Sequence, residues 1–373
     1  MIYLSNQNIA QLLTPKDCIE ALDEAFHALA RGEAASRPRT DVWVPCGRDD
    51  GYYRWGSMEG AIEPWGIFCT RMKSDIVTWT PQGTDELHCV QPGTFSGFIM
   101  LFSTRNGEPL AMMNDGVLHH LRVAAGAALG VRYLARENAA VVGCLGSGGM
   151  AHAYLPAFCA VRKISRVKVY SPTQAHRETF AKEMGRELGI PVEPFDNPEP
   201  VVRGSDIITT CTDSNKLVIT DPAWIEKGMH LANCSSKEFS LEIVKRCDVV
   251  AQVGTETFGA KGGMADSERH HGWASWVVGQ PEQQARIPKR PVSNLDFVSY
   301  PELTDLITIR RSGARRHLRS HSFTISACWD FNSRRLPPRP ISSLARRAWD
   351  WKCLRIRSYR MLGTRLMHRV HKP

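Results

Sequence analysis

Residues 138–151 read N-A-A-V-V-G-C-L-G-S-G-G-M-A, a short apolar run that leads directly into a glycine-rich turn. The apolar residues 139–145 are typical of a strand that is buried on both faces of a sheet. Gly146, Gly148 and Ala151 occupy the three small positions of the pattern GxGxxG/A. The first allows a tight turn, the second a close approach of the backbone to a pyrophosphate, and the third close packing of the following helix. The stretch therefore predicts a dinucleotide-binding turn.

The sequence that follows supplies the context that such a turn requires. Residues 167–170 indicate a second strand and residues 174–188 a helix, which completes a strand, helix, strand unit. Further short apolar runs occur at 206–210, 230–233 and 249–253. We therefore expect an α/β fold with a doubly wound parallel sheet of the Rossmann type. The alternative is a tight turn that binds no ligand. The residues of the turn that we expect at the cofactor are Gly146, Ser147, Gly148, Gly149, Met150 and Ala151.

The segment from Tyr170 to Arg177 follows the second strand, where an acidic residue normally binds the ribose hydroxyls of NAD. It contains no acid. Ser171, Thr173 and Arg177 supply two hydroxyls and a cation, which are groups that suit a phosphate. This composition favours NADP(H) over NAD(H). The alternative is that Ser171 and Thr173 cap the next helix and that Arg177 is an exposed charge.

Length and composition limit the class of protein. The 373 residues suggest two domains, and a hydrophobic content of 43% is enough to build their cores. The eleven cysteines show no CxxC or metal-ligand spacing, so we expect no metal site and a reducing cytoplasm. The sequence shows no signal peptide, and no apolar run approaches the roughly 18 residues of a membrane span. A soluble cytoplasmic protein without a membrane partner is the expectation.

The net charge of +9 is distributed unevenly. Residues 310–373 hold 17 of the 47 Lys and Arg residues but only two acids, Asp330 and Asp350, so residues 1–309 carry a net charge of −6. Residues 310–373 also lack helical periodicity. We interpret them as an atypical basic tail, either translated out of frame or disordered. A basic arm that binds nucleic acid is the alternative, which the acidic remainder of the chain disfavours.

The first 120 residues have a different pattern. Thr14-Pro15-Lys16-Asp17 is typical of a helix start with a capping box, and apolar residues continue on one face as far as Gly32. Two apolar runs flank Asn106-Gly107, which predicts a β-hairpin. Residues 117–136 then predict a long helix rich in alanine and leucine. We expect an α+β substrate-binding and dimerisation domain over 1–120, the Rossmann domain over 121–309 and the tail over 310–373.

Several short motifs occur in a recognisable order and spacing. They are residues 107–111 (G-E-P-L-A), 115–116 (D-G), 121–125 (L-R-V-A-A), 133–136 (Y-L-A-R), the turn at Gly146, 205–210 (S-D-I-I-T-T) and 303–307 (L-T-D-L-I). In these motifs the chain resembles the ornithine cyclodeaminase/mu-crystallin family over residues 1–309. The resemblance implies a homodimer that uses NAD(P)(H) and acts on small amino acids or cyclic imines. The implied chemistry is hydride exchange at a carbon that bears nitrogen.

The resemblance also implies roles for individual cations. Arg122 matches the family arginine that binds the substrate carboxylate, a task suited to a planar bidentate donor. Arg39 resembles a second carboxylate-binding arginine. Either Lys73 or Arg71 matches the lysine near the reacting centre. For Arg39, Lys73 and Arg71, the alternative is a solvated or structurally paired charge.

The chain departs from the family pattern at two positions. Cyclodeaminases carry an aspartate that assists proton transfer after the strand that begins here at His230, but Ser236 or Lys237 stands at that position. His119 replaces a threonine and is a candidate acid or base, with a structural histidine as the alternative. These departures favour an NAD(P)H-dependent oxidoreductase of a small carboxylate-bearing imine or amino acid. Ornithine cyclodeamination and a non-catalytic accessory subunit of an amine-oxidising system are the alternatives.

Two further segments belong to the expected site. Thr210, at the end of the S-D-I-I-T-T segment, and Thr212, two residues further on, are expected to contact the cofactor. The polar stretch 262–288 contains His270-His271 and Trp276. We interpret this stretch either as a lid or partner surface or as a simple surface excursion.

Overall fold

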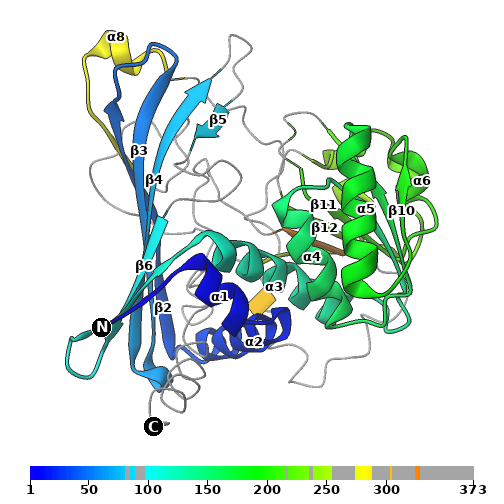
Figure 1. Ribbon diagram of the computed structural model, residues 1–373, viewed down its shortest axis with the longest axis horizontal. Coiled ribbons are helices and arrows are strands. Elements are labelled where there is room, and N and C mark those ends of the chain that lie inside the picture. The colour runs from blue at the N-terminus through cyan, green and yellow to red at the C-terminus, as the bar shows by residue number, and fades with distance from the viewer. Residues whose placement is uncertain are drawn as a thin grey trace, which may run out of the picture.

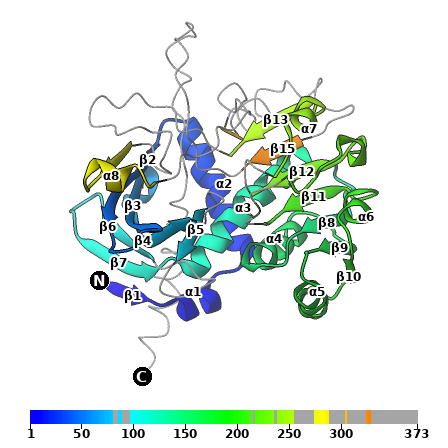
Figure 2. The same cartoon turned by 90° about the horizontal axis from the view of Figure 1, so that it is seen from above.

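The fold is described from a computed structural model. The structure describes residues 1–79, 85–88, 97–212, 214, 217–234, 238–253, 274–287, 303–304 and 324–327. In this part of the chain, one mostly antiparallel sheet and one parallel sheet lie on either side of a layer of helices (Figure 1). The view from above shows α3 (Gly116–Leu134) between the two sheets (Figure 2).

The first sheet has the strand order β1-β7-β6-β4-β3-β2-β14, and β5 pairs with β4. Its strands pair antiparallel except for β1 with β7 and β14 with β2. Burial alternates along β3 and β4, as expected for strands with one face toward the core. The strands are β1 (Ile2–Leu4), β2 (Ala34–Pro45), β3 (Gly51–Ile62), β4 (Ile67–Trp79), β5 (Asp85–His88), β6 (Gly97–Ser103), β7 (Pro109–Asn114) and β14 (Ala274–Val277).

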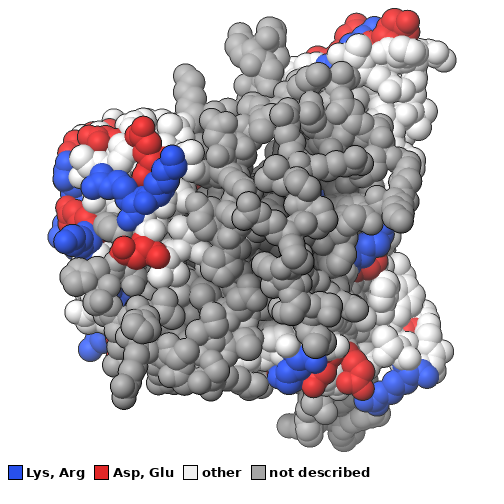
Figure 3. Space-filling model, turned by 180° about the vertical axis from the view of Figure 1, so that it is seen from behind, with Lys and Arg blue, Asp and Glu red and all other residues white. Residues whose placement is uncertain are grey.

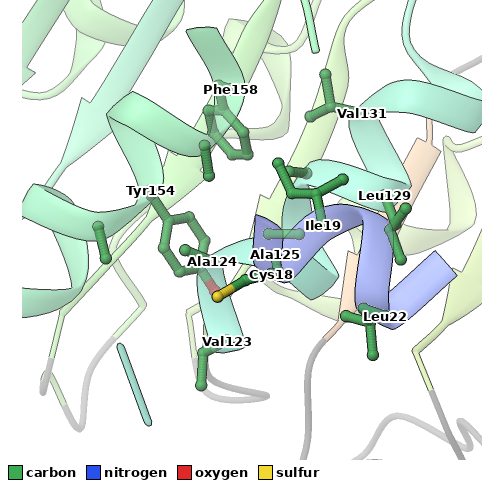
Figure 4. Packing of buried hydrophobic residues seen from close by; sticks show 14 of the residues in the cluster. Cys18, Ile19, Leu22, Val123, Ala124, Ala125, Leu129, Val131, Tyr154 and Phe158 are labelled. Atoms are coloured by element: carbon green, nitrogen blue, oxygen red, sulfur yellow. The ribbon is translucent and has the colours of Figure 1, made fainter. Parts of the chain in front are cut away.

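The predicted hairpin and the predicted helices are present. Strands β6 and β7 pair antiparallel around a turn in which Gly107 has a φ of 77°, a conformation that glycine adopts without strain. Helix α1 (Asn6–Leu12) precedes α2 (Pro15–Ala30), which Thr14 caps in a capping box with Asp17. Apolar side chains of α2, α3 and α4 (Gly149–Cys159) interlock in the main core (Figure 4).

The second sheet is parallel throughout and has the order β10-β9-β8-β11-β12-β15-β13. The order runs away from β8 in both directions, as in a doubly wound fold, so the Rossmann prediction is confirmed. The strands are β8 (Val141–Leu145), β9 (Arg166–Tyr170), β10 (Val192–Phe195), β11 (Ile207–Thr210), β12 (His230–Asn233), β13 (Val249–Gln252) and β15 (Thr324–Ala327). The remaining helices are α5 (Gln174–Leu188), α6 (Glu199–Val202), α7 (Leu241–Lys245), α8 (Pro281–Gln284) and the 3₁₀ turns Glu63–Trp65 and Pro222–Trp224.

Two segments distant in sequence extend the sheets. Strand β14 comes from the polar stretch 262–288 and adds to the edge of the first sheet beside β2. Strand β15 comes from the predicted tail and lies between β12 and β13. His270-His271 and the rest of residues 310–373 lie outside the described residues.

The described surface mixes charges of both signs. On the face shown in Figure 3, several described patches contain Lys and Arg side chains next to Asp and Glu side chains, and other described areas carry neither. Among the helices that the structure describes, none combines the length and apolar composition of a bilayer crossing.

Candidate functional site

The turn after β8 requires glycine at its first position. Gly146 has a φ of 116°, and a Cβ atom there would lie 2.3 Å from the carbonyl oxygen of Cys211. Its N–H donates to the carbonyl oxygen of Tyr170 at 2.8 Å. Three strands therefore meet at this turn: β8, which it follows, and β9 and β11 on either side. A side chain would push the turn away from β11.

The second glycine faces open space. A Cβ at Gly148 would meet no atom within 4 Å, and Gly148 has an ordinary φ of −87°. Helix α4 begins at the next residue, and no side chain caps its first turn. The amide groups of this turn and the helix dipole thus suit an anion, and the buried Ala151 lets the helix approach the sheet. The described residues fit a pyrophosphate here.

Helix α3 joins this turn to the first sheet. The ring of His120 lies so close to Gly149 that a Cβ there would be 2.9 Å from its Cε1 atom. The ring of the preceding residue, His119, is centred 6.0 Å from that of His120. Because successive residues of a helix point in different directions, one end of α3 borders both the glycine turn and the cation cluster described below.

At the end of β9, the cation that was expected to receive a phosphate is buried and already has partners. Arg177 is buried, donates to the carbonyl oxygen of Ser171 at 3.1 Å, and pairs with Asp196. Thr173 occupies the N-cap position of α5, but its side chain makes no capping hydrogen bond. Arg177 is therefore a partnered cation, unlike the exposed charge that was the alternative interpretation.

The end of β11 is held by a carboxylate that the sequence did not single out. Glu238 is fully buried and accepts from the hydroxyls of Thr210 and Thr212, both at 2.8 Å. It also accepts from the backbone N–H groups of Thr212 and Cys234 at 3.0 and 3.1 Å. An acid just beyond β12 was visible in the sequence, but only the folded chain brings it to the two threonines. Ser236 and Lys237 lie outside the described residues.

Lys73 lies on the inner face of the first sheet between two glycines. In the ladder it is directly opposite Gly56 of β3 and Gly97 of β6. A Cβ at Gly56 would lie 2.6 Å from Asp41, and one at Gly97 would lie 2.9 Å from Asp115. The two glycines therefore leave room for charged groups of neighbouring strands to gather around Lys73. We call Arg39, Arg54, Arg71, Lys73, Asp41, Asp75 and Asp115 the cation cluster.

Each cation of the cluster has a carboxylate partner. Asp75 Oδ2 accepts from both Lys73 Nζ and Arg54 Nη2 at 2.8 Å. Asp115, at the start of α3, accepts from Arg71 through Nε at 2.9 Å and Nη2 at 2.6 Å. The third pair joins residues 39 and 41 of β2, with 3.0 Å between the guanidinium Nε and Oδ1. All these residues are buried, so Arg39, Arg71 and Lys73 are not solvated charges. Each of them is paired with a carboxylate, as in the second form of the alternative interpretation, and their role in a site stays a prediction.

Burial changes the acidity of this cluster. Loss of water, reinforced by the charge of Arg54 and opposed by Asp75, lowers the pKa of Lys73 to about 7. For Asp75, burial acts to raise the pKa, but the charges of Lys73 and Arg54 outweigh it, so the pKa of Asp75 lies below its ordinary value. Near neutral pH, the charged and neutral forms of Lys73 are therefore both populated, while its carboxylate partner stays ionised.

The first turns of α3 add Arg122 and His119. Arg122 is buried, and its Nη2 lies 3.1 Å from Nδ1 of His119. Because a guanidinium only donates, Nδ1 accepts. Burial, and then the charges of Arg122, Arg71 and Lys73, lower the pKa of His119 well below its ordinary value. His119 is thus neutral at neutral pH, which suits a hydrogen-bonding role better than that of an acid.

The structure brings the candidates together in two groups. Lys73, Arg71 and Arg39 lie in the cation cluster, and His119 of α3 is close enough for the charges of Arg71 and Lys73 to act on it. The glycine turn borders the same end of α3 through His120. The sequence analysis did not single out the partners Arg54, Asp41 and Asp75, and it noted Asp115 only as part of the D-G motif. Alternation along strands 39–41 and 71–75 was the available signal, because residues two apart share a face.

Comparisons with known proteins identify the family and the fold. A model of the ornithine cyclodeaminase/mu-crystallin family matches residues 2–265. The chain is 32% identical over 156 residues to a Delta(1)-pyrroline-2-carboxylate reductase of Bacillus cereus. The matched region covers 42% of this chain and 46% of that protein. It is 26% identical to an NAD(P)H-dependent anabolic L-arginine dehydrogenase of Pseudomonas aeruginosa, over 72% of this chain and 81% of that one.

The same fold occurs in a solved structure. Thermococcus litoralis Delta(1)-pyrroline-2-carboxylate reductase, in complex with NADH and L-proline, matches with a TM-score of 0.64 and 22% identity, over 88% of this chain and 91% of that chain. At this identity the comparison shows the fold alone. The chain spans about half the length of the Bacillus reductase that it matches.

Proposed function

Because the chain belongs to the ornithine cyclodeaminase/mu-crystallin family, we propose that it is an NAD(P)H-dependent oxidoreductase of a small imine or amino acid that carries a carboxylate. The observation that carries the proposal is Lys73, a buried lysine with a pKa of about 7 next to the end of α3 that borders the glycine turn. A lysine in this state can give or take a proton at neutral pH. Relatives named as pyrroline-carboxylate reductase and arginine dehydrogenase support the same class of reaction.

The chain's own residues divide the work as follows. The amides from Gly146 to Ala151 would hold the pyrophosphate, and the bound nicotinamide supplies or accepts the hydride. Arg122 and Arg39 bind the substrate carboxylate, since planar guanidinium groups match it. In reduction, Lys73 Nζ donates a proton to the substrate nitrogen, and in oxidation it accepts that proton. Arg71 acts differently, because its two bonds to Asp115 anchor α3 to β4.

A binding and turnover experiment tests the proposal. NADH and NADPH are titrated by fluorescence, and pyrroline and piperideine carboxylates and pyruvate with amines are then screened for coenzyme oxidation. Arg122→Ala should raise KM for the carboxylate substrate at least tenfold and leave coenzyme affinity unchanged. A variant that retains full activity would contradict the carboxylate role. Ammonia release from ornithine without net coenzyme oxidation would favour a cyclodeaminase, and coenzyme binding without any turnover an accessory subunit.

The outer face of the first sheet supports a homodimer. Trp276 of β14, Val42 of β2 and Trp55 of β3 are neighbours in one row across three strands, and each is at least 36% exposed. Phe98 of β6 is exposed to a similar degree. A row of large apolar side chains on a sheet face is typical of an interface between subunits. Trp55→Glu should convert a dimer to a monomer in light scattering, and a wild-type monomer would contradict this proposal.

A further inference from the structure

We propose that Asp196, held by the buried Arg177, makes the protein prefer NADH over NADPH. The inference rests on the proposed coenzyme site at the glycine turn. The sequence expectation of NADP(H) depended on the absence of an acid between Tyr170 and Arg177. The structure brings an acid to the same place from the next strand.

Register places three residues at one edge of the second sheet. Leu145 of β8, Tyr170 of β9 and Phe195 of β10 are neighbours in one row. The next residues along the chain are Gly146, Ser171 and Asp196. Parallel strands end at the same edge, so Asp196 follows its strand beside Ser171, as Ser171 follows its strand beside the glycine turn. The adenosine ribose of a coenzyme on that turn is recognised at the end of β9, next to this acid.

The charges at this edge favour the ribose 2′-hydroxyl of NADH over the 2′-phosphate of NADPH. The side chain of Arg177 is only 9% exposed, and its guanidinium bonds the Ser171 carbonyl and the Asp196 carboxylate. The Asp196 side chain is 90% exposed. The cation is thus buried and compensated, whereas the anion faces the solvent. A carboxylate accepts a hydrogen bond from a ribose hydroxyl, but it repels a 2′-phosphate and occupies the arginine that would bind it.

Substitution of the acid should reverse the preference. Fluorescence titration at fixed ionic strength should give wild-type protein a Kd for NADH about tenfold or more below that for NADPH. Asp196→Asn removes the charge and releases Arg177, so NADPH should bind about tenfold more tightly and NADH slightly more weakly. In the double variant Asp196→Asn with Arg177→Met, the gain for NADPH should disappear, because the released cation is gone.

Glu193→Gln is the matched control. Glu193 also lies on β10 and pairs with Arg166, but it stands two residues before Phe195, the last residue of the strand, and three residues before Asp196. This variant changes the net charge by the same amount and should leave the ratio of the two Kd values unchanged. Wild-type preference for NADPH, or an unchanged ratio in Asp196→Asn, would overturn the inference alone. Failure of both coenzymes to bind would overturn the proposed function with it.

Discussion

The glycine turn and the cation cluster are built by opposite means. At the turn, the useful groups are backbone amides and the absence of side chains: Gly146 is closed in by the Cys211 carbonyl, and Gly148 faces open space. In the cluster, the useful groups are buried charges, and every cation has a carboxylate partner. The turn is one short segment that contacts single carbonyl groups at Tyr170 and Cys211, whereas the cluster depends on the antiparallel register of several long strands.

The difference indicates which substitutions each region tolerates. A turn that works through its backbone tolerates changes around it but not an added Cβ atom. In a cluster of buried charges, loss of one charge is costly where its partner is left uncompensated, as Arg71 would be without Asp115. The loss is less costly where the partner keeps another ion, as Asp75 keeps Arg54 without Lys73. Substitutions in the two regions should therefore separate coenzyme binding from proton transfer.

The largest effect is expected from Lys73→Met. Loss of a positioned proton donor should lower kcat by about 10²- to 10⁴-fold, while the Kd for coenzyme measured by fluorescence stays within about twofold. Arg54 still pairs with Asp75 in this variant, so the carboxylate keeps a partner. If coenzyme affinity fell as steeply as kcat, the two regions would not be separable in this way.

The pH profile should show the next largest effect. With a pKa of about 7, Lys73 is charged below neutrality and neutral above it. In the reductive direction, kcat/KM should fall about tenfold per pH unit above 7, because the proton donor is lost. In the oxidative direction, kcat/KM should rise with pH up to about 7 and then level off. Lys73→Arg serves as the control, since arginine keeps its proton and should remove the step near pH 7.

A matched pair of glycine substitutions sharpens the comparison at the turn. Gly146→Ala places a Cβ against the Cys211 carbonyl in a strained backbone conformation, so the free energy of unfolding should fall by about 2–4 kcal/mol. Gly148→Ala adds a methyl group in open space and should leave the unfolding temperature unchanged, but it should weaken coenzyme binding about tenfold. Equal behaviour of the two variants in thermal unfolding would refute the distinction.

Glu238→Gln should give the smallest effect on binding. A glutamine side chain has one oxygen that accepts hydrogen bonds, whereas a carboxylate has two. Some of the donors from Thr210, Thr212 and Cys234 therefore lose their acceptor. Stability should fall by about 1–3 kcal/mol, with a change of only about threefold in coenzyme Kd. A Kd change of a hundredfold, at unchanged unfolding temperature, would instead mean that the carboxylate touches the coenzyme.

Much of the fold was predictable from local patterns. The periodicity of residues 174–188 matches α5, and the capping box at Thr14 marks the start of α2. Strand β15 at Thr324–Ala327 was not predicted, because its four residues, T-I-S-A, are too few and too polar to stand out from the basic sequence around them. Asp196 also could not be connected to Arg177, because they are 19 positions apart along the chain, with the rest of α5 and strand β10 between them.

By itself, the sequence determined the strand and glycine turn at 138–151, because φ preferences and close approach act within a few residues. It also determined the family and therefore the candidates Arg39, Lys73 and Arg122. Only the tertiary structure decided which carboxylates Arg39 and Lys73 pair with and what the pKa of Lys73 is. The pKa of a lysine depends on how much water it has lost and on which charges lie within a few ångströms, and antiparallel register, with glycines on both sides of Lys73, sets both.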